Sequence, residues 1–144
     1  MEKRKIIAYT DGGSFNNPGP SGIGGVFFDE NKKELARFCE FIGDGTNNQA
    51  EYKAVIKALE IAKSEFQATE VEFFLDSELI VKQMNQEYKI KHPDLKPLFF
   101  KIREMILGFS LITFGHIKRE KNKIADSLVK KAIKERKSFE ITKS

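Results

Sequence analysis

The 144-residue chain has one cysteine, four prolines, no tryptophan and no long apolar run. Its single thiol, on Cys39, excludes an internal disulfide and fits a reducing compartment. No segment approaches the roughly 18 uninterrupted apolar residues that a membrane-spanning helix needs. The N-terminus also lacks the apolar stretch and cleavage site of a secretory signal. We therefore expect a cytoplasmic protein without membrane contact.

The residues that are present are typical of a soluble globular domain. Apolar residues make up 40% of the chain and charged residues 32%. The length is sufficient to bury a sizeable core without disulfides or metals. No repeat, linker or low-complexity segment divides the sequence. Residues 1–144 are thus predicted to form a single domain.

The formal charge of +4 is unevenly distributed along the chain. Residues 116–144 hold ten Lys or Arg and four Asp or Glu, so this segment carries +6 and the remainder −2. A basic C-terminal part favours an anionic partner such as nucleic acid. A solvated, lysine-rich helix face explains such a charge run about as well.

The order of the expected elements predicts an α/β fold. Alternating and apolar runs predict five strands, at residues 5–11, 22–28, 34–42, 71–75 and 110–117. Helical spacing predicts helices that begin near residues 46, 77, 98 and 122. The first three strands form an antiparallel meander, and the helix after them is a crossover that makes the fourth strand parallel to the first. The prediction is a five-stranded mixed sheet with helices on both faces.

Two acids stand on the apolar faces of predicted helices. Glu51 shares its face with Val55, and Asp126 shares its face with Val129. Burial of an unpaired carboxylate is costly. The structural alternative is an acid near the start of a helix, where it interacts with the helix dipole.

Two further acids each end a predicted strand. Asp11 precedes Gly12 and Gly13, and Asp76 precedes the Ser77 start of a helix. A turn former and a helix cap are the structural alternatives. However, strand ends and helix starts of this topology meet at one edge of the sheet, where open α/β sheets form their sites.

Four carboxylates at one edge would repel one another, and hard cations would relieve that repulsion. Ligation by oxygen alone suits magnesium or manganese, and the chain has no Cys/His pattern for zinc. Two such ions roughly 4 Å apart can activate water and stabilise the leaving oxygen in phosphodiester hydrolysis. The residues alone therefore predict a two-metal hydrolase.

Several motifs in the chain resemble those of the type 1 ribonuclease H family. They are YTDGGS at 9–14, NPGP at 17–20, TNNQAE at 46–51, DS at 76–77, GH at 115–116, Asn122 and AD at 125–126. The resemblance covers nearly the whole chain. It implies an endonuclease that cleaves the RNA strand of RNA–DNA hybrids and leaves 5′-phosphomonoesters. It also implies that Asp11, Glu51, Asp76 and Asp126 are the catalytic acids that hold two Mg²⁺ or Mn²⁺ ions.

The resemblance also assigns residues around the acids. His116 resembles the family's mobile histidine, proposed to help with proton transfer or product departure; the alternative is a histidine that ends an edge strand. The implied substrate-binding residues are Gly12, Gly13, Asn17, Asn47, Asn48 and Gln49. Neutral donors and acceptors suit recognition of the RNA 2′-hydroxyl across a shallow groove. Turn and cap chemistry explains the same residues structurally.

The chain also departs from the family pattern. It has no tryptophan and only a short segment, residues 88–97, in place of a Trp-rich basic protrusion. Glu78 stands where many members have glutamine. Two other functions remain open: the same fold acting on double-stranded RNA, and a non-catalytic nucleic-acid-binding module, which the four intact acids oppose. No obligate protein partner is evident, so we expect a monomer.

Overall fold

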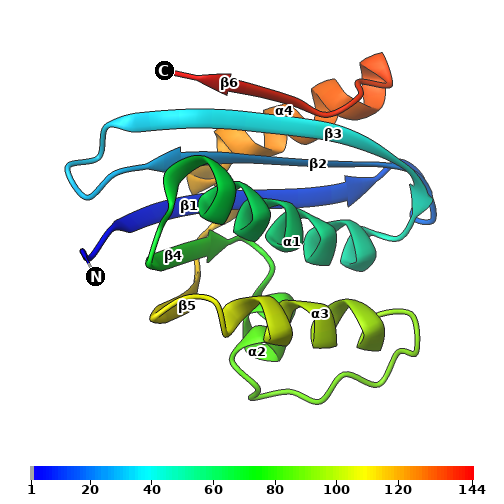
Figure 1. Cartoon of the computed structure of the whole chain (residues 1–144). Coiled ribbons are helices and arrows are strands. Elements are labelled where there is room, and N and C mark those ends of the chain that lie inside the picture. The colour runs from blue at the N-terminus through cyan, green and yellow to red at the C-terminus, as the bar shows by residue number, and fades with distance from the viewer. Residues whose placement is uncertain (1) are drawn as a thin grey trace.

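The computed structural model describes residues 2–144 and arranges them as a six-stranded sheet with helices on both faces (Figure 1). The strands are β1 (Lys5–Ser14), β2 (Gly19–Phe28), β3 (Glu34–Gly45), β4 (Glu70–Leu75), β5 (Leu111–His116) and β6 (Glu140–Lys143). The α-helices are α1 (Asn47–Phe66), α2 (Glu78–Met84), α3 (Lys96–Ile106) and α4 (Lys123–Glu135). A short 3₁₀ turn, Arg119–Lys121, precedes α4.

The pairing of the strands confirms the predicted α/β class. The order is β5-β4-β1-β2-β3-β6; β2 is antiparallel to β1 and β3, whereas β4 is parallel to β1 and β5 is parallel to β4. The sheet has one strand more than predicted, because β6 pairs antiparallel with β3. β6 has only four residues and is partly polar, so no periodic pattern marked it in the sequence.

The first strand is longer than predicted. Asp11 was expected to be its last residue, but β1 continues to Ser14 because Gly12 and Gly13 pair with residues of β2. Asp76 lies one position beyond the end of β4, close to the predicted place. The Gly-Gly pair is therefore part of the strand and not the turn that follows it.

Gly12 and Gly13 face opposite layers of the molecule. A Cβ on Gly12 would lie 2.2 Å from the carbonyl carbon of Ala50 in α1, so no other residue fits there without a shift of the backbone. A Cβ on Gly13 would lie 3.6 Å from a methyl group of Val129 in α4. Figure 1 shows α1 and α4 on the two faces of the sheet. The close approach at Gly12 brings the start of α1 directly against β1.

The start of α1 is fixed by a capping box. The Thr46 hydroxyl accepts the backbone N–H of Gln49 at 3.1 Å, and the Gln49 side-chain oxygen accepts the backbone N–H of Thr46 at 2.9 Å. The apolar residues of α1, including Tyr52, Val55 and Leu59, are buried in the hydrophobic core. This anchorage fixes the rotation of the helix and therefore the direction of Glu51 in its first turns. No helix within residues 2–144 is both long and apolar enough to cross a membrane.

Candidate active site

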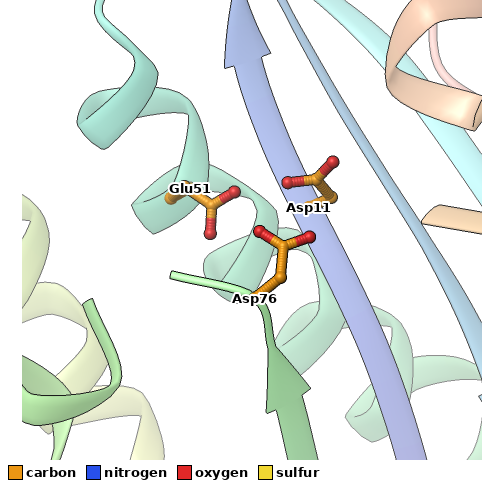
Figure 2. A group of neighbouring side chains, drawn as sticks. All are labelled: Asp11, Glu51 and Asp76. Carbon is orange, nitrogen blue, oxygen red and sulfur yellow. The ribbon is translucent and has the colours of Figure 1, made fainter. Parts of the chain in front are cut away.

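Three acidic side chains converge at the end of the parallel strands. Asp11 comes from β1, Glu51 from α1 and Asp76 from the residue after β4, and Figure 2 shows their carboxylates directed toward one another. One oxygen of each lies within 4.8 Å of the others. We call these three residues the acidic triad. β1 and β4 are parallel neighbours, which is why Asp11 and Asp76 reach the same edge.

Two members of the acidic triad are buried. Asp11 is 8% exposed and Glu51 is 5% exposed. The backbone N–H of Gly12 donates to Asp11 Oδ1 at 3.0 Å and to Glu51 Oε1 at 2.9 Å. Glu51 Oε2 is buried without a hydrogen-bond partner among the described residues. Such an oxygen is unfavourable on its own and is suited to accept a ligand.

Burial changes the protonation of this pair. Burial, together with the negative charges of Asp76 and Asp126, raises the pKa of Asp11 to about 6. Burial, followed by interaction with the Asp11 carboxyl group, raises the pKa of Glu51 well above its ordinary value. These carboxyl groups consequently retain protons to unusually high pH. A set of oxygen ligands with an unpartnered buried oxygen fits a hard divalent cation, which would stabilise the fully ionised form.

The raised pKa values predict how the stability of the metal-free protein depends on pH. A carboxyl group whose pKa is higher in the folded than in the unfolded state binds more protons when folded, so its contribution to stability is lost as pH rises. For Asp11 the loss falls between about pH 4 and pH 6, and Glu51 extends it upward. Urea unfolding from pH 4 to pH 8 should therefore show a smaller decline in the free energy of unfolding for Asp11→Asn than for the unchanged chain. If the free energies of unfolding of the two proteins changed with pH in parallel, this would contradict the burial and mutual repulsion of Asp11 and Glu51.

The fourth predicted acid, Asp126, lies on another wall of the same cleft. The cleft has a volume of about 690 Å³ and lies between residues 11–15, the start of α1, the Asp76–Ser77 turn and the segment from Arg119 to Lys134. Asp126 is not in the acidic triad: Lys130 Nζ lies 3.0 Å from its Oδ2 and Arg119 lies 3.9 Å from its Oδ1. The sequence prediction paired neither cation with Asp126, although Asp126 and Lys130 have the i,i+4 spacing of a helical ion pair.

Asn122 is a further site residue whose contacts the sequence did not reveal. It is 2% exposed, and its side-chain amide donates to the Thr10 carbonyl oxygen and to Asp76 Oδ2, both at 3.0 Å. An asparagine before a helix favours a cap, but this side chain makes no cap hydrogen bond to α4. Its contacts hold the Asp76 carboxylate in place beside β1.

His116 is the last residue of β5 and is partly exposed. Its Nδ1 lies 4.0 Å from Glu78 Oε2. His116 is not among the described residues that line the cleft. The histidine thus approaches the site from the far side of Asp76 and is not in direct contact with the acidic triad in this structure.

The predicted substrate-binding residues surround the start of α1. Gly12, Gly13, Asn47 and Asn48 line the cleft, whereas Asn17, Asn47, Asn48 and Gln49 line an adjoining hollow of about 300 Å³. Asn17 Oδ1 accepts the Asn47 N–H at 2.9 Å, and Asn47 Oδ1 accepts the Ser14 N–H at 2.7 Å. The side-chain oxygens of Asn17 and Asn47 thus have structural partners within the chain.

Comparison with known proteins places this geometry in a family. The family model described as reverse transcriptase-like matches residues 9–132, which include all four acids. The chain is 37% identical over 129 residues to ribonuclease HI of Halobacterium salinarum, which covers 90% of the chain and 64% of that protein. The crystal structure of LC11-RNase H1 in complex with an RNA/DNA hybrid matches with a TM-score of 0.87 and 47% identity, over 91% of this chain and 98% of that one. The chain belongs to the type 1 ribonuclease H family.

Other ribonuclease H relatives are longer than this chain. A bifunctional protein of Mycobacterium tuberculosis is 38% identical over 130 residues, which are 90% of this chain and 35% of that protein. The chain therefore spans about a third of the length of the mycobacterial relative.

Proposed function

We propose that this chain is an endoribonuclease that hydrolyses the RNA strand of RNA–DNA hybrids with two divalent cations, Mg²⁺ or Mn²⁺, and leaves 5′-phosphomonoesters. The observation that supports this most directly is the buried acidic triad with the unpartnered Glu51 Oε2. The choice of substrate is supported by LC11-RNase H1, whose structure was determined with an RNA/DNA hybrid.

The residues that would hold the cations are Asp11, Glu51, Asp76 and Asp126. When bound, divalent cations lower the pKa of an attacking water and stabilise charge on the leaving oxygen of an in-line displacement. The Gly12 N–H orients one oxygen each of Asp11 and Glu51, and Asn122 orients Asp76. These contacts fix the carboxylates before substrate arrives, which limits the reorganisation needed during reaction.

The cationic wall of the cleft suits the phosphates of the substrate. Arg119 and Lys130 are largely exposed and both contact Asp126. Phosphate oxygens are strong acceptors of such charge-assisted hydrogen bonds. We propose that the phosphates of a bound strand pair with Arg119 and Lys130 in place of Asp126. The Asp126 carboxylate is then free for metal binding. Phosphate contacts position a strand without reading its sequence, which is consistent with cleavage of hybrids of varied sequence.

The opposite wall suits recognition of ribose. The backbones of Gly12 and Gly13 and the side chains of Asn47 and Asn48 line it. They provide neutral donors and acceptors, the groups expected to distinguish a 2′-hydroxyl from a hydrogen atom. We propose that these residues favour RNA for the strand that passes over the acidic triad.

A cleavage assay on three labelled substrates tests this function. Hybrid, double-stranded RNA and double-stranded DNA are each incubated with Mg²⁺, with Mn²⁺ and without metal. We expect metal-dependent cuts in the RNA strand of the hybrid, with 5′-phosphate ends. Preferred cleavage of double-stranded RNA would show that this duplex, and not the hybrid, is the substrate. Binding of hybrid without cleavage would indicate a non-catalytic module.

His116→Ala should slow the enzyme without inactivating it. Loss of a group that assists proton transfer or product departure should reduce kcat by about 10- to 100-fold with little change in KM. Steady-state kinetics on hybrid would measure this. The control is Thr113→Ala, because Thr113 is an exposed residue of the same strand, β5, and lies outside the cleft. An unchanged kcat in His116→Ala would leave His116 as a residue that merely ends an edge strand.

Residues 1–144 are also proposed to act as one catalytic domain and as a monomer. All four acids proposed to hold the cations come from this chain, so the proposed activity does not require a residue from a second subunit. Sedimentation analysis at assay concentrations would test the oligomeric state, and a stable dimer would contradict it.

A further inference from the structure

An exposed aromatic side chain stands at the mouth of the cleft. Phe15 is 64% exposed although it lines the same cleft as the acidic triad. Of the described residues that line the cleft, it is the only aromatic one. Single exposed apolar residues are common on protein surfaces. Exposure alone therefore says little, and the surroundings of Phe15 have to be considered.

The backbone around Phe15 is held firmly against α1. The Phe15 N–H donates to the Pro20 carbonyl oxygen at 2.8 Å, which closes the β1–β2 hairpin. On one side of Phe15, the Ser14 N–H donates to Asn47 Oδ1. On the other side, Asn17 Oδ1 accepts the Asn47 N–H. Because both flanks are bonded to Asn47, the backbone that carries the Phe15 ring is held at the mouth of the cleft.

The other walls of the cleft offer mainly charged and polar groups because, of their two apolar residues, Val129 is buried and Ile133 is only partly exposed. The acidic triad is suited to cations, and Arg119, Lys130 and Lys134 are suited to phosphates. None of these groups contacts the apolar faces of a nucleic acid. An aromatic ring does so readily and without regard to sequence. In a duplex the bases are stacked on one another, so the accessible apolar surface along a shallow groove is that of the sugars.

We infer that Phe15 packs against the sugars of the nucleic-acid strand that enters the cleft and so contributes to substrate affinity. This inference rests on the proposed function and extends it to a residue that the catalytic acids do not include. The Phe15 contact also gives the chain an apolar interaction with substrate, although the chain lacks a tryptophan-rich protrusion. The contact holds the strand in register over Asp11, four positions earlier in the same hairpin arm.

Kinetics on hybrid with matched phenylalanine variants test the inference. Phe15→Ala should raise KM about tenfold while kcat changes less than about twofold, because the contact is the same in ground state and transition state. Phe15→Leu keeps an apolar side chain, so its KM should lie between that of the unchanged chain and that of Phe15→Ala. The control is Phe100→Ala, because Phe100 is 66% exposed on α3, a helix that contributes no residue to the cleft. Thermal unfolding of each variant shows whether folding is preserved.

The outcomes separate this inference from the proposed function. Hybrid cleavage with the same KM in Phe15→Ala as in the unchanged chain overturns the inference and leaves the function standing. An equal rise in KM for Phe100→Ala also overturns it. If the unchanged chain binds double-stranded RNA in place of hybrid, fluorescence anisotropy with that duplex makes the same comparison. A chain that binds none of the three duplexes overturns the inference together with the function.

Discussion

Asp11→Asn is expected to lower the rate of hybrid hydrolysis by about a thousandfold or more, since it removes a charged ligand from the centre of the acidic triad. The same substitution should stabilise the metal-free chain. Burial and neighbouring acids raise the pKa of Asp11 to about 6, so its ionised form opposes folding at neutral pH by on the order of 1–3 kcal/mol. Asparagine keeps the oxygen that accepts the Gly12 N–H. Hydrolysis assays and urea unfolding at pH 7.5 would measure both effects.

The control for this variant is Asp44→Asn, which removes the same charge from an exposed position on β3 outside the cleft. We expect it to change neither hydrolysis nor stability appreciably. Magnesium-dependent cleavage that persists in Asp11→Asn would overturn the assignment of Asp11 as a metal ligand. A loss of stability in that variant would show that the Asp11 carboxylate has a favourable partner that the structure does not contain.

Gly12→Ala is expected to destabilise the fold by about 3 kcal/mol. The added Cβ would lie 2.2 and 2.3 Å from the carbonyl atoms of Ala50 and 2.5 Å from the Glu51 nitrogen. These are backbone atoms, so relief of the clash requires α1 to move away from β1. That movement would also withdraw Glu51 from Asp11 and reduce hydrolysis. Urea unfolding and the hybrid cleavage assay would report the two consequences.

The neighbouring glycine supplies the control. A Cβ on Gly13 would meet Val129 at 3.6 Å and Asn47 at 3.8 Å, which are ordinary contact distances. Gly13→Ala should therefore change stability by less than about 0.5 kcal/mol. Equal losses in the two variants would mean that strand flexibility, and not the approach of α1, sets the requirement for glycine.

Local patterns in the sequence were sufficient for the fold class and for most of the acids. Glu51 was recognisable because it interrupts an apolar helical face, and the structure buries it. Asp76 was recognisable from the strand before it and the Ser77 cap after it, and Ser77 does cap α2. Both inferences depend on periodicity within a few residues, which a sequence displays directly.

Contacts between distant segments were not accessible in the same way. Asn122 reaches the carbonyl of Thr10, 112 positions away, and its own neighbours in sequence favour an ordinary helix cap. The continuation of β1 past Asp11 depends on the partner strand, because Gly-Gly more often ends a strand than extends one. The contact of Arg119 with Asp126 likewise depends on how the segment before α4 folds against the helix. The Lys130–Asp126 pair is different, because its i,i+4 spacing is visible in the sequence.

The short strand β6 has a consequence for how the molecule behaves at high concentration. A bare edge strand offers unpaired backbone groups to strands of other molecules and so promotes aggregation. In this chain the segment from Ala36 to Cys39 of β3 is paired along that edge by β6. Glu140 of β6 also forms ion pairs with Lys131 and Lys137, which anchor the strand to the α4 side. The sheet therefore ends on this side in a strand of four residues that carries charged side chains, which is a poorer template for intermolecular β-pairing than the twelve-residue β3 would be.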